Sequence, residues 1–494
     1  MSGDWVVAAL FLIAAVLLLS RLENGCLWQD EAETAVLARN TRHFGYPRAF
    51  DGRNLIEVPA SYGRGPAEAW IYSPWLPFYL LAGVFALAGE STWAARMPFA
   101  LLCLLTVFLT WRLARRLTEN RTIRRLSVAL MAGSVPFLLH MRQCRYYSLA
   151  AALVLAVCLA YLMFLREPTG KRATVLGAAL VLLFHATFGT FVPVFAAVLT
   201  HQALWGTPQT RRRSILLCAV VTALTLPWAL FFYRSGFVGT FSLGRVARHF
   251  EYYVRITNKY LMPLAAMAVG SGLLWLTRRR PAATAPRRPP EAVWFLALMA
   301  AAQLAFLLVP DQRHMRYLIP AFPLLALAEA WWLAGWWARS RWAGAILTAL
   351  ALFTNALQSP RPRLPLADFM GELTHAYRGP MDGVVEYLRE HARPGDVAKI
   401  PYDDRTLMFY TTLAVEPPSD FLRESYPRWI IIRRDWIPKP FFNSEYFRRI
   451  EAGYDRIVLD GPDVLWQNRE DPGSHHFRTV QGVPPVVIYR KREI

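Results

Sequence analysis

The chain has 494 residues, of which 55% are hydrophobic and only 18% are charged, and its formal net charge is +20. Soluble globular domains carry about 25% charged residues, so this composition excludes a simple soluble protein and indicates a polytopic membrane protein. A soluble protein with this charge would suggest a nucleic-acid partner. In a membrane protein, however, basic loops beside anionic lipid account for much of the charge, and we expect no nucleic-acid partner.

Apolar segments that can cross a bilayer, with roughly 20 residues or slightly fewer, recur along most of the chain. We predict about eleven spans, at residues 5–20, 95–113, 126–140, 148–165, 173–184, 191–205, 215–232, 260–276, 292–309, 317–337 and 342–357. A further apolar piece, residues 75–88, is short and begins beside Pro74 and Pro77. We therefore expect this piece to be re-entrant or interfacial rather than a full crossing.

Lysine and arginine in short loops mark the cytoplasmic side of a membrane protein. Every second loop is basic, as alternation across a membrane requires: residues 112–125, 166–172, 211–213, 278–288 and 339–341. The opposite side then holds the first loop, the C-terminal tail and the loops at residues 142–147, 185–189, 235–257 and 311–316. We therefore expect the first loop and the tail to lie outside the cytoplasm.

Two regions of the chain stand outside the predicted spans. The first loop, residues 21–73, is too long for a mere connector. In the tail, residues 381–391 have helical spacing, and short apolar runs at 397–400, 429–432, 456–459 and 486–489 suit strands. We predict an all-α polytopic membrane domain, residues 1–358, followed by a small α/β domain, residues 360–494. The tail has no cysteine, so we expect neither a disulfide framework nor thiolate metal binding there.

An acidic pair, Asp30 and Glu31, stands about ten residues after the first apolar segment, at the head of the polar loop. Ionisable groups at a membrane boundary usually serve function, so both are candidates for catalysis. The alternative is structural, because acidic residues favour the positive end of a helix dipole and residues 32–42 suit such a helix. Both interpretations hold together if an Asp that opens an interfacial helix is thereby held at the water boundary.

The other loops on this side add cations, aromatic rings and two histidines. These candidates are Arg142, Arg145, Tyr146 and Tyr147 in one loop, His185 in the next, and Arg313, His314, Arg316 and Tyr317 in the last. Arginine binds phosphate bidentately and stacks on rings, which suits a lipid-linked phosphate head group. Alternatively, Arg and Tyr are ordinary interface anchors. His185, at a break between apolar segments, either contacts sugar or phosphate or is an ordinary helix-end residue.

The segment Trp28-Gln29-Asp30-Glu31-Ala32, placed after one transmembrane helix, resembles the acidic motif of the GT-C membrane glycosyltransferases. It is most similar to bacterial members of the protein O-mannosyltransferase and aminoarabinose-transferase (ArnT-like) group, which use polyprenyl-phosphate sugars. Further similar stretches are RQCRYYSL at 142–149, RYLIP at 316–320 with PLL at 323–325, and WQN at 466–468 followed by 471–472 and 475–477. Each motif is short, and the resemblance depends on their order and topology.

The resemblance implies inverting transfer of a sugar from a polyprenyl-phosphate donor to a hydroxyl of a cell-envelope lipid, polysaccharide or protein. The reaction would occur on the outer face of a bacterial inner membrane. By the family pattern Asp30 is the base, and Glu31 orients it or supports the loop helix. The residues assigned to the donor phosphate or head group are Arg142, Arg145 and Arg316, with Tyr146, Tyr147 and Tyr317 beside them.

One departure from the family concerns a metal ion. Some relatives have a second Asp two residues after the arginine that matches Arg142, where it helps hold a divalent ion, and this chain has Cys144. No cofactor is therefore certain, a divalent ion stays open, and Glu57 or Glu68 are substitutes without a spacing argument. The rival functions are a transporter or flippase of a lipid-linked glycan, which the lack of an internal repeat disfavours, and a scaffold, which does not need eleven spans.

Overall fold

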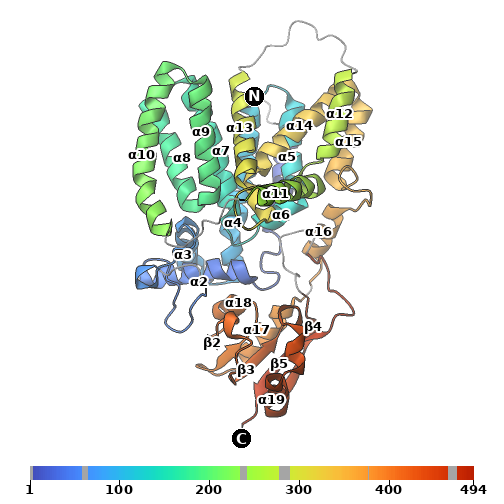
Figure 1. Ribbon diagram of the computed structural model, residues 1–494. Helices are drawn as coiled ribbons and strands as arrows, with labels where there is room; N and C mark the ends of the chain where they lie inside the picture. Colours follow the sequence, from blue (N-terminus) through green and yellow to red (C-terminus); the bar gives the residue numbers. More distant parts are fainter. Residues whose placement is uncertain are drawn as a thin grey trace.

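The computed structural model describes residues 4–57, 65–233, 242–276, 290–376, 378–464 and 475–493. It consists of a bundle of apolar helices with a small sheet region at one end (Figure 1). The basic loop at residues 278–288 and the motif residues 466–468 and 471–472 lie outside the described residues.

Each predicted span falls on a helix or on a pair of bent helices. Five helical segments within the described residues are long and apolar enough to cross a membrane: α4 (Thr92–Leu117), α7 (Tyr147–Arg166), α9 (Phe188–Trp205), α10 (Pro208–Tyr233), and η3 (Met315–Ala321) continued by α14 (Phe322–Arg339). Two bent pairs raise this number to seven: α5 (Arg121–Gly133) with α6 (Val135–Met141), and α11 (Leu243–Ile256) through η2 (Thr257–Leu261) with α12 (Leu264–Leu276).

The four remaining predicted spans fall on shorter helices: α1 (Trp5–Leu19), α8 (Gly170–Ala186), α13 (Pro290–Phe306) and α15 (Arg341–Phe353). The protein is thus a multi-pass helical membrane protein, as its composition predicted.

Proline stands in both bends of the bundle. Pro136 opens α6, and the axes of α5 and α6 meet at 64°. Pro263 stands between η2 and α12, where the bend is 79°. Proline has no N–H to donate and its ring clashes with the carbonyl four residues back, which accounts for the break before α6. Met262, which precedes Pro263, takes the extended conformation that proline favours in the residue before it. The first bend directs α6 toward Arg142 and the turn that leads into α7.

The first loop forms a helix across the end of the bundle (Figure 1). This helix, α2 (Gln29–Phe44), is polar in sequence but largely buried, because it lies between the bundle and the sheet region. It ends where Gly45 takes a φ of 81°, a conformation that favours glycine. The apolar piece expected not to cross forms the 13-residue helix α3 (Leu76–Ala88), which packs on α2, and its non-crossing placement stays a prediction.

The tail forms a five-stranded sheet with strand order β2-β1-β3-β5-β4. Its strands are β1 (Val397–Lys399), β2 (Ala414–Val415), β3 (Trp429–Ile432), β4 (Tyr454–Pro462) and β5 (Pro485–Lys491). The tail helices are α16 (Pro365–Thr374), α17 (Pro380–His391), α18 (Asp404–Tyr410) and α19 (Glu445–Gly453). Short 3-10 turns in the tail are η4 (Pro418–Asp420), η5 (Arg434–Trp436) and η6 (Lys439–Asn443), and a further one, η1 (Pro66–Glu68), belongs to the first loop. The four predicted strands and the predicted helix are all present.

The sheet is mixed, because β1 pairs in parallel with β2 and β3, whereas β5 pairs antiparallel with β3 and β4. Its register places Ile488 opposite both Ile431 and Ile457. One apolar core joins the sheet to the first loop, with members that include Leu37, Phe85, Leu407 and Ile488. The tail is therefore packed against the helix that carries the acidic pair, while the domain ranges 1–358 and 360–494 stay predictions.

Candidate functional site

The first turn of α2 places Asp30 among two of the predicted arginines. The Asp30 side chain is 19% exposed, and its Oδ2 lies 3.1 Å from Nη1 of Arg316 and 3.9 Å from Nη2 of Arg145. Arg145 comes from the turn between α6 and α7, and Arg316 from η3. Segments far apart in the sequence thus bring one carboxylate and two guanidinium groups together, as the loop alternation predicted.

Arg145 also holds the first turn of α2 through its Nη1. That atom donates to the Asp30 backbone oxygen at 2.8 Å, to Thr34 Oγ1 at 3.0 Å and to Glu33 Oε1 at 3.1 Å. Three acceptors within about one turn of the same helix leave this guanidinium little freedom. Charge-assisted hydrogen bonds of this kind are the strong ones, so the position of Asp30 is set by its own helix and by Arg145.

Aromatic rings lie beside both arginines. The Arg145 guanidinium carbon is 5.8 Å from the Tyr146 ring centre, and that of Arg316 is 5.8 Å from the Tyr317 ring. Tyr147 is fully buried behind Tyr146, with the two ring centres 4.8 Å apart. Guanidinium groups at this distance from a ring face are attracted to it, so the predicted tyrosines help orient the predicted arginines.

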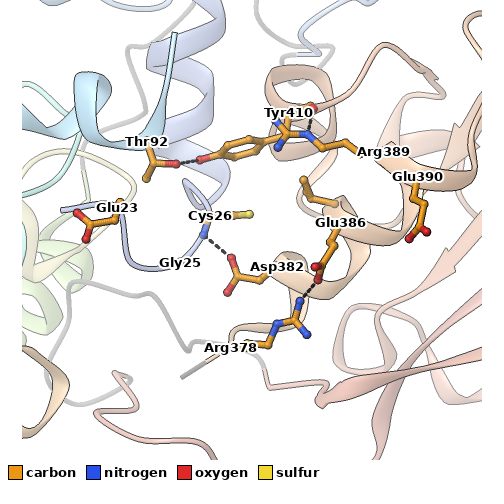
Figure 2. Close-up of a pocket in the computed structure, with 11 residues that line it drawn as sticks. Glu23, Gly25, Cys26, Thr92, Arg378, Asp382, Glu386, Arg389, Glu390 and Tyr410 are labelled. Atoms are coloured by element: carbon orange, nitrogen blue, oxygen red, sulfur yellow. Dashed lines mark hydrogen bonds and ion pairs between the residues drawn. The ribbon is translucent and has the colours of Figure 1, made fainter. Parts of the chain in front are cut away.

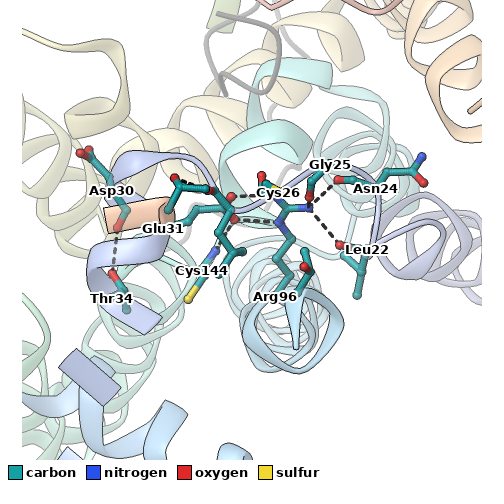
Figure 3. A network of polar contacts seen from close by, with 12 residues as sticks. Leu22, Asn24, Gly25, Cys26, Asp30, Glu31, Thr34, Arg96 and Cys144 are labelled. Atoms are coloured by element: carbon teal, nitrogen blue, oxygen red, sulfur yellow. Dashed lines mark hydrogen bonds and ion pairs between the residues drawn. The ribbon is translucent and has the colours of Figure 1, made fainter. Parts of the chain in front are cut away.

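Glu31 points away from Asp30 into a buried ion pair (Figure 3). Its two oxygens accept Nε and Nη2 of Arg96 at 2.9 and 2.7 Å, and Oε1 also accepts the Cys144 N–H at 2.9 Å. Arg96 in turn donates to backbone carbonyls of the segment before α2, including Leu22 and Asn24. With its side chain 0% exposed, Glu31 suits the supporting role and not contact with an acceptor.

Two predicted site residues lie outside the Asp30 cluster. Arg142 donates to the Ser20 carbonyl at 2.5 Å, and its guanidinium carbon is 5.4 Å from the Phe369 ring of α16. His185, near the end of α8, packs edge-on against Trp228 of α10 at 5.4 Å. These contacts favour packing roles for both residues, although their assignment to substrate binding stays a prediction.

Two charged residues that the sequence analysis missed complete the cluster. Glu33, buried and one turn after Asp30 on α2, pairs with Arg145 on one side and with Arg405 of α18 on the other. Arg405 Nη2 also donates to the Glu57 backbone oxygen at 2.8 Å. Helical spacing signals Glu33, because residues three apart share a helix face. No local signal identifies Arg405, which meets Glu33 across 372 positions.

Burial and neighbouring charges shift two titrating groups of α18. Burial by itself lowers the pKa of Arg405, but the carboxylates of Glu33, Asp404 and Asp30 outweigh it and the pKa rises, so Arg405 stays charged. Burial raises the pKa of Asp404, which accepts a hydrogen bond from Gln29 Nε2 at 2.5 Å. The tail therefore presents a permanent cation to the first turns of α2.

The side chains around Asp30 include arginines but few groups that could bind a metal ion. Within the described ranges, no group of three or more His, Cys, Asp or Glu side chains is placed to hold a metal. The candidate substitutes are engaged elsewhere, because Glu57 accepts from Ser419 and Glu68 pairs with Arg48. Cys144 contributes its backbone N–H to Glu31.

A separate cavity of about 590 Å³ opens where the first loop meets α17 (Figure 2). Cys26, Asp382, Arg389 and Tyr410 are among the residues that line it, and Asp30 is not. Asp382 accepts the Cys26 N–H at 2.7 Å, and Arg389 donates to the Tyr410 carbonyl at 2.8 Å. The first of these two hydrogen bonds joins the first loop to the tail, and the second lies within the tail, so the cavity lies where the two regions meet.

Comparison of sequences finds a family model but no individual relative. The model for dolichyl-phosphate-mannose-protein mannosyltransferases matches residues 72–231. No curated protein matches the chain significantly.

Solved structures of two proteins share the architecture. ArnT from Cupriavidus metallidurans bound to undecaprenyl phosphate is similar with a TM-score of 0.57 at 13% identity, over 99% of this chain and 98% of that chain. ArnT in the apo state gives 0.59 at 14% identity, over 98% and 97%. The oligosaccharyltransferase from Archaeoglobus fulgidus, in complex with Zn and sulfate, gives 0.57 at 13% identity, over 86% and 67%. At these identities the likeness shows a common fold.

Proposed function

We propose that this chain, a member of the GT-C superfamily by its fold, is a glycosyltransferase that moves a sugar from a polyprenyl-phosphate donor to an acceptor hydroxyl. The observation that carries the proposal is the cluster in which Asp30 meets Arg145 and Arg316 at the end of the bundle. A carboxylate serves as a base, and guanidinium groups bind phosphate. The ArnT structure with undecaprenyl phosphate supports a lipid-linked phosphate as the donor class.

In the proposed reaction, Asp30 accepts the proton of the acceptor hydroxyl while the acceptor oxygen forms a bond to the anomeric carbon. The bond between that carbon and the phosphate oxygen breaks, and the polyprenyl phosphate leaves with the electron pair. Attack opposite the leaving group inverts the anomeric configuration. The charge that develops on the phosphate requires cations nearby, and Arg145 and Arg316, which lie beside Asp30, would supply them.

The site faces the outside of the cytoplasm in this proposal, and the membrane is a bacterial inner membrane. The basic loops on the other side of the bundle support this orientation through the positive-inside rule. The acceptor is a cell-envelope lipid, polysaccharide or protein, and the donor sugar is a pentose or hexose carried on the polyprenyl phosphate. We propose that the arginines neutralise the leaving phosphate without a divalent ion, since they already hold both carboxylates of the cluster.

The test measures transfer of radiolabelled sugar from a panel of polyprenyl-phosphate sugars to membrane acceptors, for wild type and Asp30→Asn. We expect one donor to be used and the variant to lose at least about 100-fold of the rate, as general-base removal typically does. Asp311→Asn is the matched control, because Asp311 pairs with Arg245 on the same predicted side and makes no described contact with Asp30. Near-normal transfer by Asp30→Asn, or translocation of a lipid-linked glycan without transfer, would contradict the proposal.

A further inference from the structure

Arg405 belongs to the tail, but its ion-pair partner, Glu33, belongs to the cluster around Asp30. Its Nη1 pairs with Glu33 Oε2, and Asp30 and Arg145 are within electrostatic range of its guanidinium. Glu33 Oε1 is 3.1 Å from Arg145 Nη1. One carboxylate therefore holds two guanidinium groups, from the α6–α7 turn and from α18, beside the residue proposed as the base.

Holding the tail against α2 does not require this charged triad. The same surfaces are joined by Arg39 donating to the Met408 carbonyl at 2.8 Å, and by Thr406 donating to the Leu27 carbonyl at 2.9 Å. Asn54 adds two hydrogen bonds, donating to the Leu413 carbonyl and accepting the Val415 N–H. Buried ion triads are often no more stabilising than well-packed apolar side chains. Stabilising the contact between the tail and α2 therefore does not by itself account for the triad of Glu33, Arg145 and Arg405.

The guanidinium groups of Arg145 and Arg405 each have one N–H donor without an acceptor among the described residues. Nε of Arg145 and Nε of Arg405 are buried and have no hydrogen-bond acceptor in the part of the chain that the structure describes. A buried donor of a charged group costs free energy when it lacks an acceptor. Phosphate oxygens are acceptors that match the arginine fork, so an anionic group beside Asp30 would use these donors.

We propose that Arg145 and Arg405, held side by side by Glu33, form an anion clamp for the phosphate of the lipid-linked donor. The tail then supplies part of the donor site, and Glu33 positions the two arginines rather than reacting with substrate. This inference rests on the proposed function, because it takes the donor phosphate as the anion. It adds to the sequence-based assignment a cation from the tail and a positioning carboxylate on α2.

The test measures binding of undecaprenyl phosphate to the full-length detergent-solubilised protein, with undecaprenol as the ligand that lacks phosphate. We expect Arg405→Gln to weaken undecaprenyl phosphate binding roughly 10- to 100-fold, as loss of charged hydrogen bonds does, and to leave undecaprenol binding unchanged. Arg39→Gln is the matched control, since Arg39 also joins α2 to α18 but contacts backbone carbonyls there. It should stay within about twofold of wild type for both ligands, because it removes no phosphate contact.

Arg405→Lys keeps the charge but loses the fork, so we expect a weakening between wild type and Arg405→Gln. This variant also tests the clamp if Arg405→Gln fails to fold. Equal weakening by Arg39→Gln and Arg405→Gln, or wild-type binding by both Arg405 variants, would overturn the clamp while leaving the proposed function intact. Failure of the wild type to prefer undecaprenyl phosphate over undecaprenol would overturn both.

Discussion

The ion pair between Glu31 and Arg96 provides a test of whether Glu31 supports the structure or reacts with substrate. We consider Glu31→Gln, which keeps the shape of the side chain and removes its charge. The Arg96 guanidinium then stays buried, with backbone carbonyls such as those of Leu22 and Asn24 as its remaining acceptors. Breaking a buried pair by removing one partner costs about 3–5 kcal/mol, and the retained amide oxygen places the expected cost near the lower end, about 3 kcal/mol.

Thermal unfolding in detergent, followed by the fluorescence of the 18 tryptophans, measures this cost. A loss of about 3 kcal/mol corresponds to a fall in Tm on the order of 5–10 °C for a domain of a few hundred residues. The control is Glu68→Gln, because Glu68 pairs with Arg48 at 2.9 Å with about a third of its side chain exposed. Exposed pairs contribute about 0–1 kcal/mol, so this control should change Tm by no more than about 3 °C.

The double variant Glu31→Leu with Arg96→Met removes both charges, and it should regain part of the Tm that Glu31→Gln loses. A Glu31→Gln protein with the Tm of wild type and no transfer activity would refute this reasoning, because it would make Glu31 a reacting carboxylate. Loss of activity together with loss of Tm is the expected result.

Two further outcomes follow from residues around the cluster. Arg142→Gln should lower Tm and leave the KM for the donor within about twofold, since Arg142 donates to the Ser20 carbonyl and lies beside the Phe369 ring. A raised donor KM at unchanged Tm would instead support the assignment of Arg142 to the phosphate. For Asp404, burial raises the pKa in the folded state, so its contribution to stability is complete below the unfolded pKa of about 3.9 and is lost as pH rises through the folded value. Asp404→Asn should therefore gain Tm relative to wild type as pH rises from 4 to 7, and a difference independent of pH would contradict this.

The architecture was largely predictable because its signals are local. Each span is a continuous apolar run, and basic loops alternate with the others, so the eleven predicted segments all fall on helices. Short runs of β-branched residues also predicted the tail strands at 429–432 and 486–489. The strand β2 and the helix α18 were not predicted, because a two-residue strand and a seven-residue helix carry too little pattern to stand out.

The site was predictable only where its residues share a motif or a loop. Asp30, Arg145 and Arg316 were predicted as site residues because they stand at the ends of apolar spans in motifs that resemble a family, and the structure brings them together. The roles within the acidic motif came from the family resemblance, which gave Asp30 as the base and Glu31 as an orienting or supporting residue. Adjacent residues on a helix point about 100° apart, and the packing around α2 shows that Glu31 is the buried carboxylate. Arg405 lies in a domain whose docking onto α2 depends on many weak contacts between distant segments. Such a contribution follows from tertiary structure, and in the proposed clamp it would make the tail part of the donor site.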